Sequence, residues 1–277
     1  MRNRLWLHIL LFFLTICTTF FVGGPLYSLA IMTILLSHEM GHYFMTRRYG
    51  VPSTLPYFIP FPMSPFGTFG ALIRMKGNMT DRKALFDIGV AGPLAGFVVS
   101  LPFIILGIKL SKVEVVVNGP GFEQLGDPLL FKILEGMIVG EIPRSFDLVL
   151  HPFAYAGWVG LFVTALNLLP VGQLDGGHVL YSVFGDRSRT VYRMVIVMLL
   201  ALAVFYNPGW LFVSILLLIF GRHHPPPFDT ETGLDTKRKV IAVIVLAIFV
   251  LSFMPAPFPE FSNVNIFSVF KKGAIFR

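Results

Sequence analysis

The chain has 277 residues, of which 55% are hydrophobic and 13% are charged, and its mean hydropathy is +0.75. This composition excludes an ordinary soluble domain and predicts an integral membrane protein, with the lipid bilayer as its partner. The net charge of +7 does not indicate a nucleic-acid partner, because Lys and Arg cluster at the ends of apolar runs, where they set membrane topology. Cys17 is the single cysteine, which excludes an intrachain disulfide and a cysteine-based metal site.

Two apolar runs begin the chain. Residues 5–22 are predicted to cross the membrane from the cytoplasm. Their basic start and apolar centre also fit a cleaved signal peptide, but the length of the run favours a span. Residues 26–46 are predicted to return, because they end at Arg47 and Arg48 and basic residues favour the cytoplasmic side.

The next segments alternate between irregular and helical patterns. Residues 52–76 are apolar but contain five prolines, which exclude a regular helix. Irregular backbone at membrane depth must be buried in protein or line a wet cavity, so a short re-entrant hairpin or loop is expected there. Residues 84–110 form the next predicted span, and the glycines of its sequence GVAGPLAG permit close helix packing. The more acidic residues 111–150 are expected to form an external loop.

The C-terminal half contains interrupted apolar runs. Residues 153–180 form the fourth predicted span, in which the sequence NLLPVGQLDGGH should open the helix. Residues 194–220 are expected to form a hairpin of short spans or a re-entrant pair, and residues 240–254 form the last apolar run. The predicted division is a membrane core at 1–225, a cytoplasmic polar linker at 226–239, and an additional C-terminal membrane segment with its tail at 240–277.

The sequence HEMGH places ionisable groups inside an apolar span, where such residues are rare and usually functional. Residues four apart share one face of a helix, so His38 and His42 can bind one metal ion. Glu39 then lies beside the metal, where it can accept a proton from a bound water. Hydrogen bonding within the core is the structural alternative. Counted back from Arg47, His38 lies on the order of 14 Å inside the cytoplasmic boundary.

A catalytic zinc site usually takes three protein ligands, so a third ligand is needed. Asp175 is preferred over Asp87, because Pro and Gly free the backbone around Asp175, whereas the helix dipole alone can account for Asp87. Asn167 is a candidate donor to a developing oxyanion, with hydrogen bonding to freed carbonyls as its structural alternative. His178 is expected to be structural or to lie behind the ligands, and His151 to mark a helix start.

These motifs resemble those of the site-2 protease family of intramembrane zinc metalloproteases, peptidase family M50. The matching stretches are HEMGH at 38–42, GTFGALIRMKG at 67–77, DIGVAGPLAGF at 87–97 and AGWVGLFVTALNLLPVGQLDGGH at 156–178. The last stretch is most similar to the branch that contains the chloroplast EGY-type proteases and their prokaryotic relatives, without PDZ or CBS domains.

The resemblance implies an all-α polytopic membrane protein with a six-helix core and a short re-entrant hairpin or loop on the substrate path. The apolar run at 240–254 lies beyond that core and is expected to form an additional C-terminal helix. It implies one zinc ion (Zn2+) per chain bound by His38, His42 and Asp175, with Glu39 as general base and Asn167 in the active site. The implied function is hydrolysis of peptide bonds within or next to transmembrane segments of single-span or polytopic membrane proteins. Because Arg47 and Arg48 end the span that carries HEMGH, the expected location is the cytoplasmic (inner) cell membrane, with the active site toward the cytoplasm.

A divalent metal or ion transporter that uses the same His/Asp cluster is the alternative function. It accounts for the ligands but leaves Glu39 without a task, and the chain shows no matched halves of the kind found in many transporters. An inactive, substrate-binding relative is a further alternative, which the complete set of ligands and base disfavours. The sequence leaves the substrate and the possibility of a homo-oligomer open.

Overall fold

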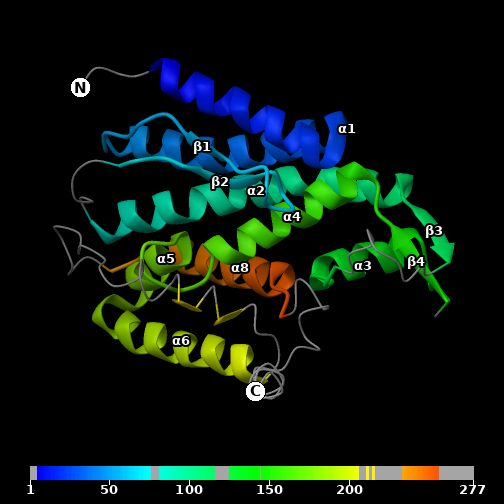
Figure 1. The fold of residues 1–277 in the computed structure, drawn as a ribbon. Coiled ribbons are helices and arrows are strands. Elements are labelled where there is room, and N and C mark those ends of the chain that lie inside the picture. Colours follow the sequence, from blue (N-terminus) through cyan, green and yellow to red (C-terminus); the bar gives the residue numbers. More distant parts are fainter. Residues whose placement is uncertain are drawn as a thin grey trace, which may run out of the picture.

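Three helical stretches of this computed structural model are long and apolar enough to cross a membrane: α1 (Leu5–Arg48), α2 (Arg82–Leu110) and the continuous stretch Asp175–Phe205 (Figure 1). The structure describes residues 5–75, 81–115, 125–143, 145–205, 210–211, 214–215 and 233–255. The length and composition of these helices indicate a membrane protein, as the sequence predicts.

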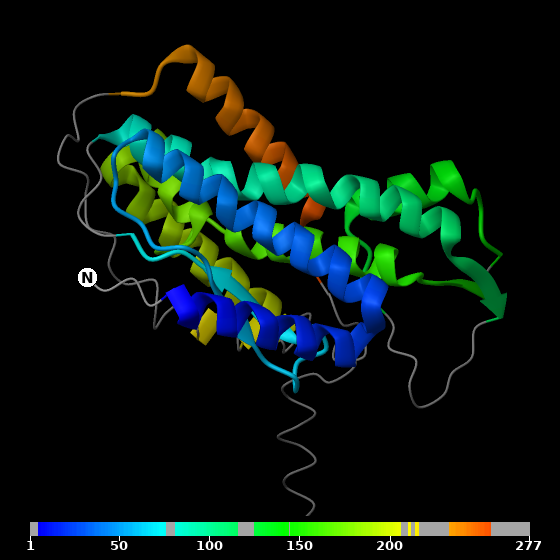
Figure 2. The same ribbon diagram turned by 90° about the horizontal axis from the view of Figure 1, so that it is seen from above.

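α1 consists of two helical halves joined at a sharp kink. Gly24 has a φ of 76° and a ψ of −175°, a conformation that glycine adopts without a Cβ clash. The halves fold back on each other (Figure 2), and the hydroxyl groups of Thr19 and Ser28 are 2.7 Å apart across the kink. The helices predicted at 5–22 and 26–46 are therefore confirmed as the two halves of α1.

A two-stranded antiparallel hairpin, β1 (Tyr57–Pro60) and β2 (Thr68–Leu72), follows α1. A bulge between Phe58 and Pro60 interrupts the pairing, at a position where proline has no amide hydrogen to donate. The hairpin expected from the proline-rich residues 52–76 is therefore confirmed.

The tip of the hairpin is held by two helices. The hydroxyl of Tyr27 in α1 donates to the carbonyl of Phe66 at 2.9 Å, and that of Tyr155 in α4 (Pro152–Asn167) donates to the carbonyl of Pro65 at 3.0 Å. At the same tip the backbone of Gly67 touches the first half of α1. These contacts join the tip to both halves of α1 and to α4.

α2 runs through the middle of the molecule and packs against both α1 and α4 (Figure 1). It begins after Asp81, whose side chain caps the helix by accepting a 2.7 Å hydrogen bond from the amide of Ala84. The approach to α1 is close, because a Cβ on Gly41 of α1 would lie 2.4 Å from the carbonyl oxygen of Ala91. α2 therefore lies directly beside the HEMGH turn of α1.

The segment after α2 contains more regular structure than the external loop that the sequence predicts. β3 (Lys112–Val115) and β4 (Phe146–Val149) form an antiparallel ribbon, and α3 (Leu129–Ile138) lies between them in sequence. Phe131 of α3 is buried in the main core cluster with Tyr27 and Trp158. These elements leave no strong local pattern, because the strands are short and their partners are distant in the sequence.

The predicted opening of the fourth span is confirmed. Residues 168–174 form turns between α4 and the following helices, which are α5 (Asp175–Phe184), a 3₁₀ turn (Gly185–Arg187) and α6 (Ser188–Phe205). The ring of His151 accepts a hydrogen bond from the backbone amide of Phe153, which confirms its predicted place at a helix start.

α8 (Thr236–Ser252) covers most of the last predicted apolar run and packs on the core, where Val245 and Ile248 contact the cluster of Phe86, Val90 and Leu168. Among the described residues, the two halves of α1 with α2, α4, α5 and α6 make the predicted six-helix core, and α8 is the additional C-terminal helix. The predicted split of the 194–220 run and the boundary at 225 lie outside the described residues.

Candidate metal centre

His38, His42 and Asp175 converge on one point from two helices. The Nε2 atoms of the two histidines are 3.2 Å apart, and the Asp175 Oδ2 atom lies 3.3 Å from that of His38 and 3.2 Å from that of His42. Both histidines are buried. The three residues form one group of potential metal ligands, although Asp175 lies 133 positions after His42 in sequence.

The turn before α5 delivers Asp175 to the histidines. Gly176 and Gly177 lie so close to this turn that added Cβ atoms would be 2.1 Å from the carbonyl oxygen of Leu168 and 2.3 Å from that of Gly172. Only glycine fits these contacts, which let the chain reverse and start a new helix. Asp175 is the first residue of α5, where the partial positive charge of the helix N-terminus favours a carboxylate.

The backbone of α2 fixes the orientation of His42. Its Nδ1 atom lies 2.8 Å from the carbonyl oxygen of Ile88, which can only accept a hydrogen bond. Nδ1 therefore holds the ring proton in neutral His42, and the lone pair of Nε2 faces His38 and Asp175. An outer hydrogen bond of this kind is the usual way to fix the tautomer of a metal-binding histidine.

Two glycines of α2 leave room for the imidazole rings. A Cβ on Gly92 would lie 2.0 Å from Nε2 of His42, and a Cβ on Gly96 would lie 3.1 Å from Nδ1 of His38. The packing role predicted for the glycines of this stretch is confirmed, and the structure adds that the packing partners are the two histidines themselves.

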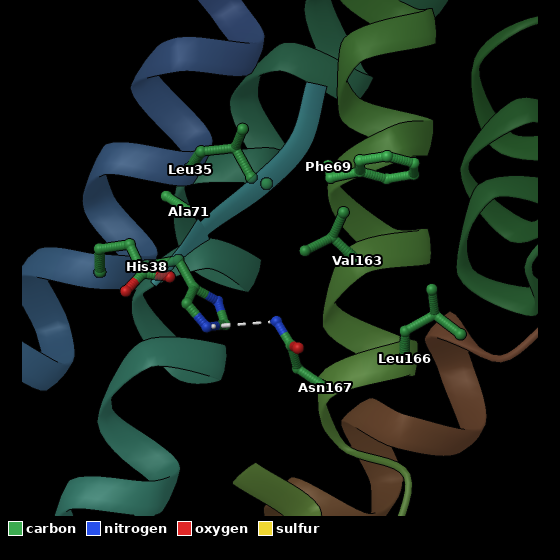
Figure 3. A pocket seen from close by; sticks show the side chains of 9 residues that line it. Leu35, His38, Phe69, Ala71, Val163, Leu166 and Asn167 are labelled. Atoms are coloured by element: carbon green, nitrogen blue, oxygen red, sulfur yellow. Dashed lines mark hydrogen bonds between the residues drawn. The ribbon is translucent and has the colours of Figure 1, made fainter. Parts of the chain in front are cut away.

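Glu39 and Asn167 line a cavity beside the three ligands. The cavity measures about 130 Å³ and is also lined by His38, by apolar residues of α1 and α4, and by residues 69–71 of β2. Figure 3 shows His38 and Asn167 facing each other across it, with 3.4 Å between Nδ2 of Asn167 and Nε2 of His38. Asn167 therefore lies beside His38, and Glu39 is buried next to the ligand group without belonging to the group of three.

The donor set fits a tetrahedral metal ion. Zinc with bonds of about 2.0 Å to nitrogen and oxygen keeps neighbouring ligand atoms about 3.3 Å apart. The separations of 3.2 and 3.3 Å among His38, His42 and Asp175 agree with that spacing. Two imidazoles and one carboxylate are also a donor set that zinc accepts, with one position left for water.

Asp87 and His178 lie outside the ligand group. Asp87 forms an ion pair with Arg238 at 2.6 Å, so a specific partner as well as the helix dipole stabilises its charge. His178 lies in α5 with its Cβ against Gly89 of α2.

The comparison with protein families gives a match over most of the chain: the model for peptidase family M50 covers residues 26–205. The chain belongs to peptidase family M50. The matched range contains all five residues of the predicted site.

Chloroplast proteins are among the relatives of this M50 chain. It is 33% identical over 230 residues to the probable zinc metalloprotease EGY1 of Arabidopsis thaliana, an alignment that covers 81% of this chain and 42% of the relative. It is 27% identical over 241 residues to the probable zinc metalloprotease EGY2 of the same plant, covering 85% and 42%. The chain thus spans less than half the length of these relatives, and the predicted similarity to the EGY branch is confirmed.

Among solved structures, the M50 chain matches the site-2 protease from Methanocaldococcus jannaschii with a TM-score of 0.41 and 16% sequence identity. The match covers 82% of this chain and 92% of the other.

Sequence reasoning did not link α2 to the metal ligands in this M50 chain. The carbonyl of Ile88 has no sequence signal, because any residue supplies one. Gly92 and Gly96 do have a signal: they are four residues apart, as His38 and His42 are, which is the spacing expected when two helices pack face to face.

Proposed function

We propose that the chain is an intramembrane zinc metalloprotease that hydrolyses peptide bonds within or next to transmembrane segments of membrane proteins. The observation that supports this most strongly is the triangle formed by His38, His42 and Asp175, with the buried carboxylate of Glu39 beside it and a cavity in front of it. One zinc ion per chain is held by these three ligands.

The chain's own residues divide the chemistry. When bound, zinc supplies the Lewis acidity that activates a water and polarises the scissile carbonyl. Glu39 accepts the proton of the attacking water and passes it to the leaving amine nitrogen. Asn167, on the opposite wall of the cavity, donates a hydrogen bond to the oxygen on which negative charge develops.

Strand β2 presents the substrate to this chemistry. A helical substrate hides its carbonyls in hydrogen bonds, so a segment must be extended before cleavage. Phe69, Gly70 and Ala71 of β2 line the same cavity as Glu39. The hairpin has β1 on one side of β2 and, among the described residues, no strand on the other. An extended segment that pairs with this edge by strand addition lies alongside the catalytic carboxylate.

The proposed location is the cytoplasmic membrane, with the site toward the cytoplasm. The second half of α1 ends at Arg47 and Arg48, and α2 begins with Arg82 and Lys83, so basic residues gather at the helix ends nearest the ligands.

Reconstitution of the purified chain with a labelled single-span substrate tests the proposal. Cleavage is expected in zinc-loaded samples and is expected to stop after treatment with a chelator. Glu39→Gln is expected to abolish cleavage while zinc remains bound, and Glu114→Gln, the same change on exposed β3, is the matched control. Cleavage by Glu39→Gln at the unaltered rate would refute the assignment. Zinc flux into vesicles that persists in Glu39→Gln would favour the transporter alternative instead.

A further inference from the structure

α8 lies beyond the family match, yet its first turn contacts the metal end of the core. The match ends at residue 205, and α8 begins at Thr236. Figure 2 shows α8 lying next to α2. Nε of Arg238 is 2.9 Å from Oδ1 of Asp87, and Nη2 is 2.6 Å from Oδ2, so the guanidinium donates one hydrogen bond to each carboxylate oxygen. Bidentate pairs of this kind fix orientation as well as charge.

The same carboxylate also joins α2 to the end of α1. The hydroxyl of Tyr49, directly after α1, donates to Oδ2 of Asp87 at 2.5 Å and accepts from Nη2 of Arg238 at 3.2 Å. The side chains of Arg238 and Asp87 are 21% and 19% exposed, so water screens their contact only in part. Three segments of the chain thus meet at one carboxylate.

Asp87 is next in sequence to the residue that orients a metal ligand. The carbonyl of Ile88 accepts the hydrogen bond from Nδ1 of His42, and Tyr49 lies seven residues after His42 in sequence. Apolar contacts reinforce the arrangement, because Val245 and Ile248 of α8 belong to one buried cluster with Phe86, which precedes Asp87. A shift of this turn of α2 relative to α1 therefore changes the hydrogen bond that aims His42.

We propose that Arg238 is a positioning residue for the metal centre: through Asp87 and Tyr49 it holds the turn of α2 whose Ile88 carbonyl orients His42. This inference rests on the proposed function, in that zinc is the ion at the site. In this proposal α8 helps to set the geometry of the metal centre, in addition to packing on the six-helix core.

Zinc affinity of the full chain tests this without any measurement of proteolysis. The purified protein in detergent is stripped of metal and titrated with zinc against a chromophoric chelator. Arg238→Gln is expected to weaken zinc binding by about tenfold, the lower end of the range for groups outside the ligands, because it acts through Asp87 and one backbone carbonyl. Lys237→Gln removes the same charge from an exposed neighbouring position and is expected to leave the affinity unchanged.

A double-mutant cycle shows whether the contact itself is responsible. Asp87→Asn is expected to weaken binding by a similar factor, and the double variant to lose no more than either single one, because each removes the same contact. Arg238→Lys keeps the charge but not the bidentate contact and is expected to show a smaller loss.

The thermal midpoints of the metal-free proteins separate positioning from bracing. A helix that only braces the fold would lower the midpoint and leave the zinc affinity of the folded protein unaltered. Unaltered affinity in Arg238→Gln, or in Arg238→Lys should the first variant not fold, would overturn the inference and leave the proposed function standing. Absence of zinc binding in the unaltered chain would overturn both.

Discussion

A methyl group added at Gly92 should remove one metal ligand. The Cβ of Gly92→Ala would lie 2.0 Å from Nε2 of His42, whereas ordinary contacts begin at 3.4 Å, so the ring or the helix must move by about 1.4 Å. Metal sites hold their ligand distances to about 0.2 Å. The displacement is several times that tolerance, and His42 also cannot retreat without losing its hydrogen bond to Ile88.

Two other glycines turn this into a graded series. A Cβ on Gly96 would lie 3.1 Å from Nδ1 of His38, which requires a shift of about 0.3 Å only, and a Cβ on Gly136 of α3 would meet nothing within 4 Å. We expect zinc affinity to fall by more than about 100-fold in Gly92→Ala, to fall slightly in Gly96→Ala, and to be unchanged in Gly136→Ala.

Zinc titration against a chelator, with the thermal midpoint of each metal-free variant measured in parallel, checks the series. Gly136→Ala should be as stable as the parent or more so, because alanine favours a helix by about 1 kcal/mol over glycine. Zinc binding by folded Gly92→Ala as tight as that of the parent would refute the assignment of His42 Nε2 as a ligand atom.

Three further outcomes are expected. Arg82→Gln should weaken zinc binding in a chelator titration. Arg82 donates to the carbonyls of Ser182 and Val183 at 2.7–3.1 Å and so holds the end of α5, the helix that begins with Asp175. Equal zinc affinity of the variant and the parent would show that α5 does not need this contact. Gly67→Ala should lower the thermal midpoint, because Gly67 has a φ of 74° and a Cβ there would lie 2.8 Å from the backbone of α1; an unaltered midpoint would contradict the fixed hairpin tip. Glu135→Gln should raise the thermal midpoint at pH 8 but not below about pH 4. Burial, and then repulsion by Asp127, raise the pKa of Glu135 in the folded state. The parent protein therefore loses stability as the pH rises through that pKa. A benefit of Glu135→Gln that is equal at both pH values would argue against this cause.

The sequence predicts the parts of the site that depend on local spacing. His38 and His42 share a helical face by their spacing of four, and Asp175 stands out because an acid in an apolar run among Pro and Gly is unusual. The hairpin follows from prolines that exclude a helix, and the two halves of α1 from the separate apolar runs at 5–22 and 26–46. The ligand triangle brings the two predicted histidines and the predicted aspartate together in space.

The remaining features depend on partners that are distant in the sequence. Arg238 and Asp87 are 151 residues apart, and nothing in the local pattern of either residue names the other. β3 and β4 are four residues each, and they pair although α3 lies between them in sequence. The bond of His42 to Ile88 uses a backbone carbonyl, a group that every residue has. Such contacts become visible only when the helices are placed side by side.

The anchored tip of the hairpin has a consequence for where a substrate would be cut. Because the carbonyls of Pro65 and Phe66 accept hydrogen bonds from Tyr155 and Tyr27, β2 has a fixed position relative to α1 and α4. Side chains alternate between the two faces of an extended chain. A substrate segment paired with β2 therefore keeps the same side chains facing inward only if its register shifts by two residues. Alternative cleavage points in one substrate should therefore be spaced by two residues, and products that differ by a single residue should be scarce.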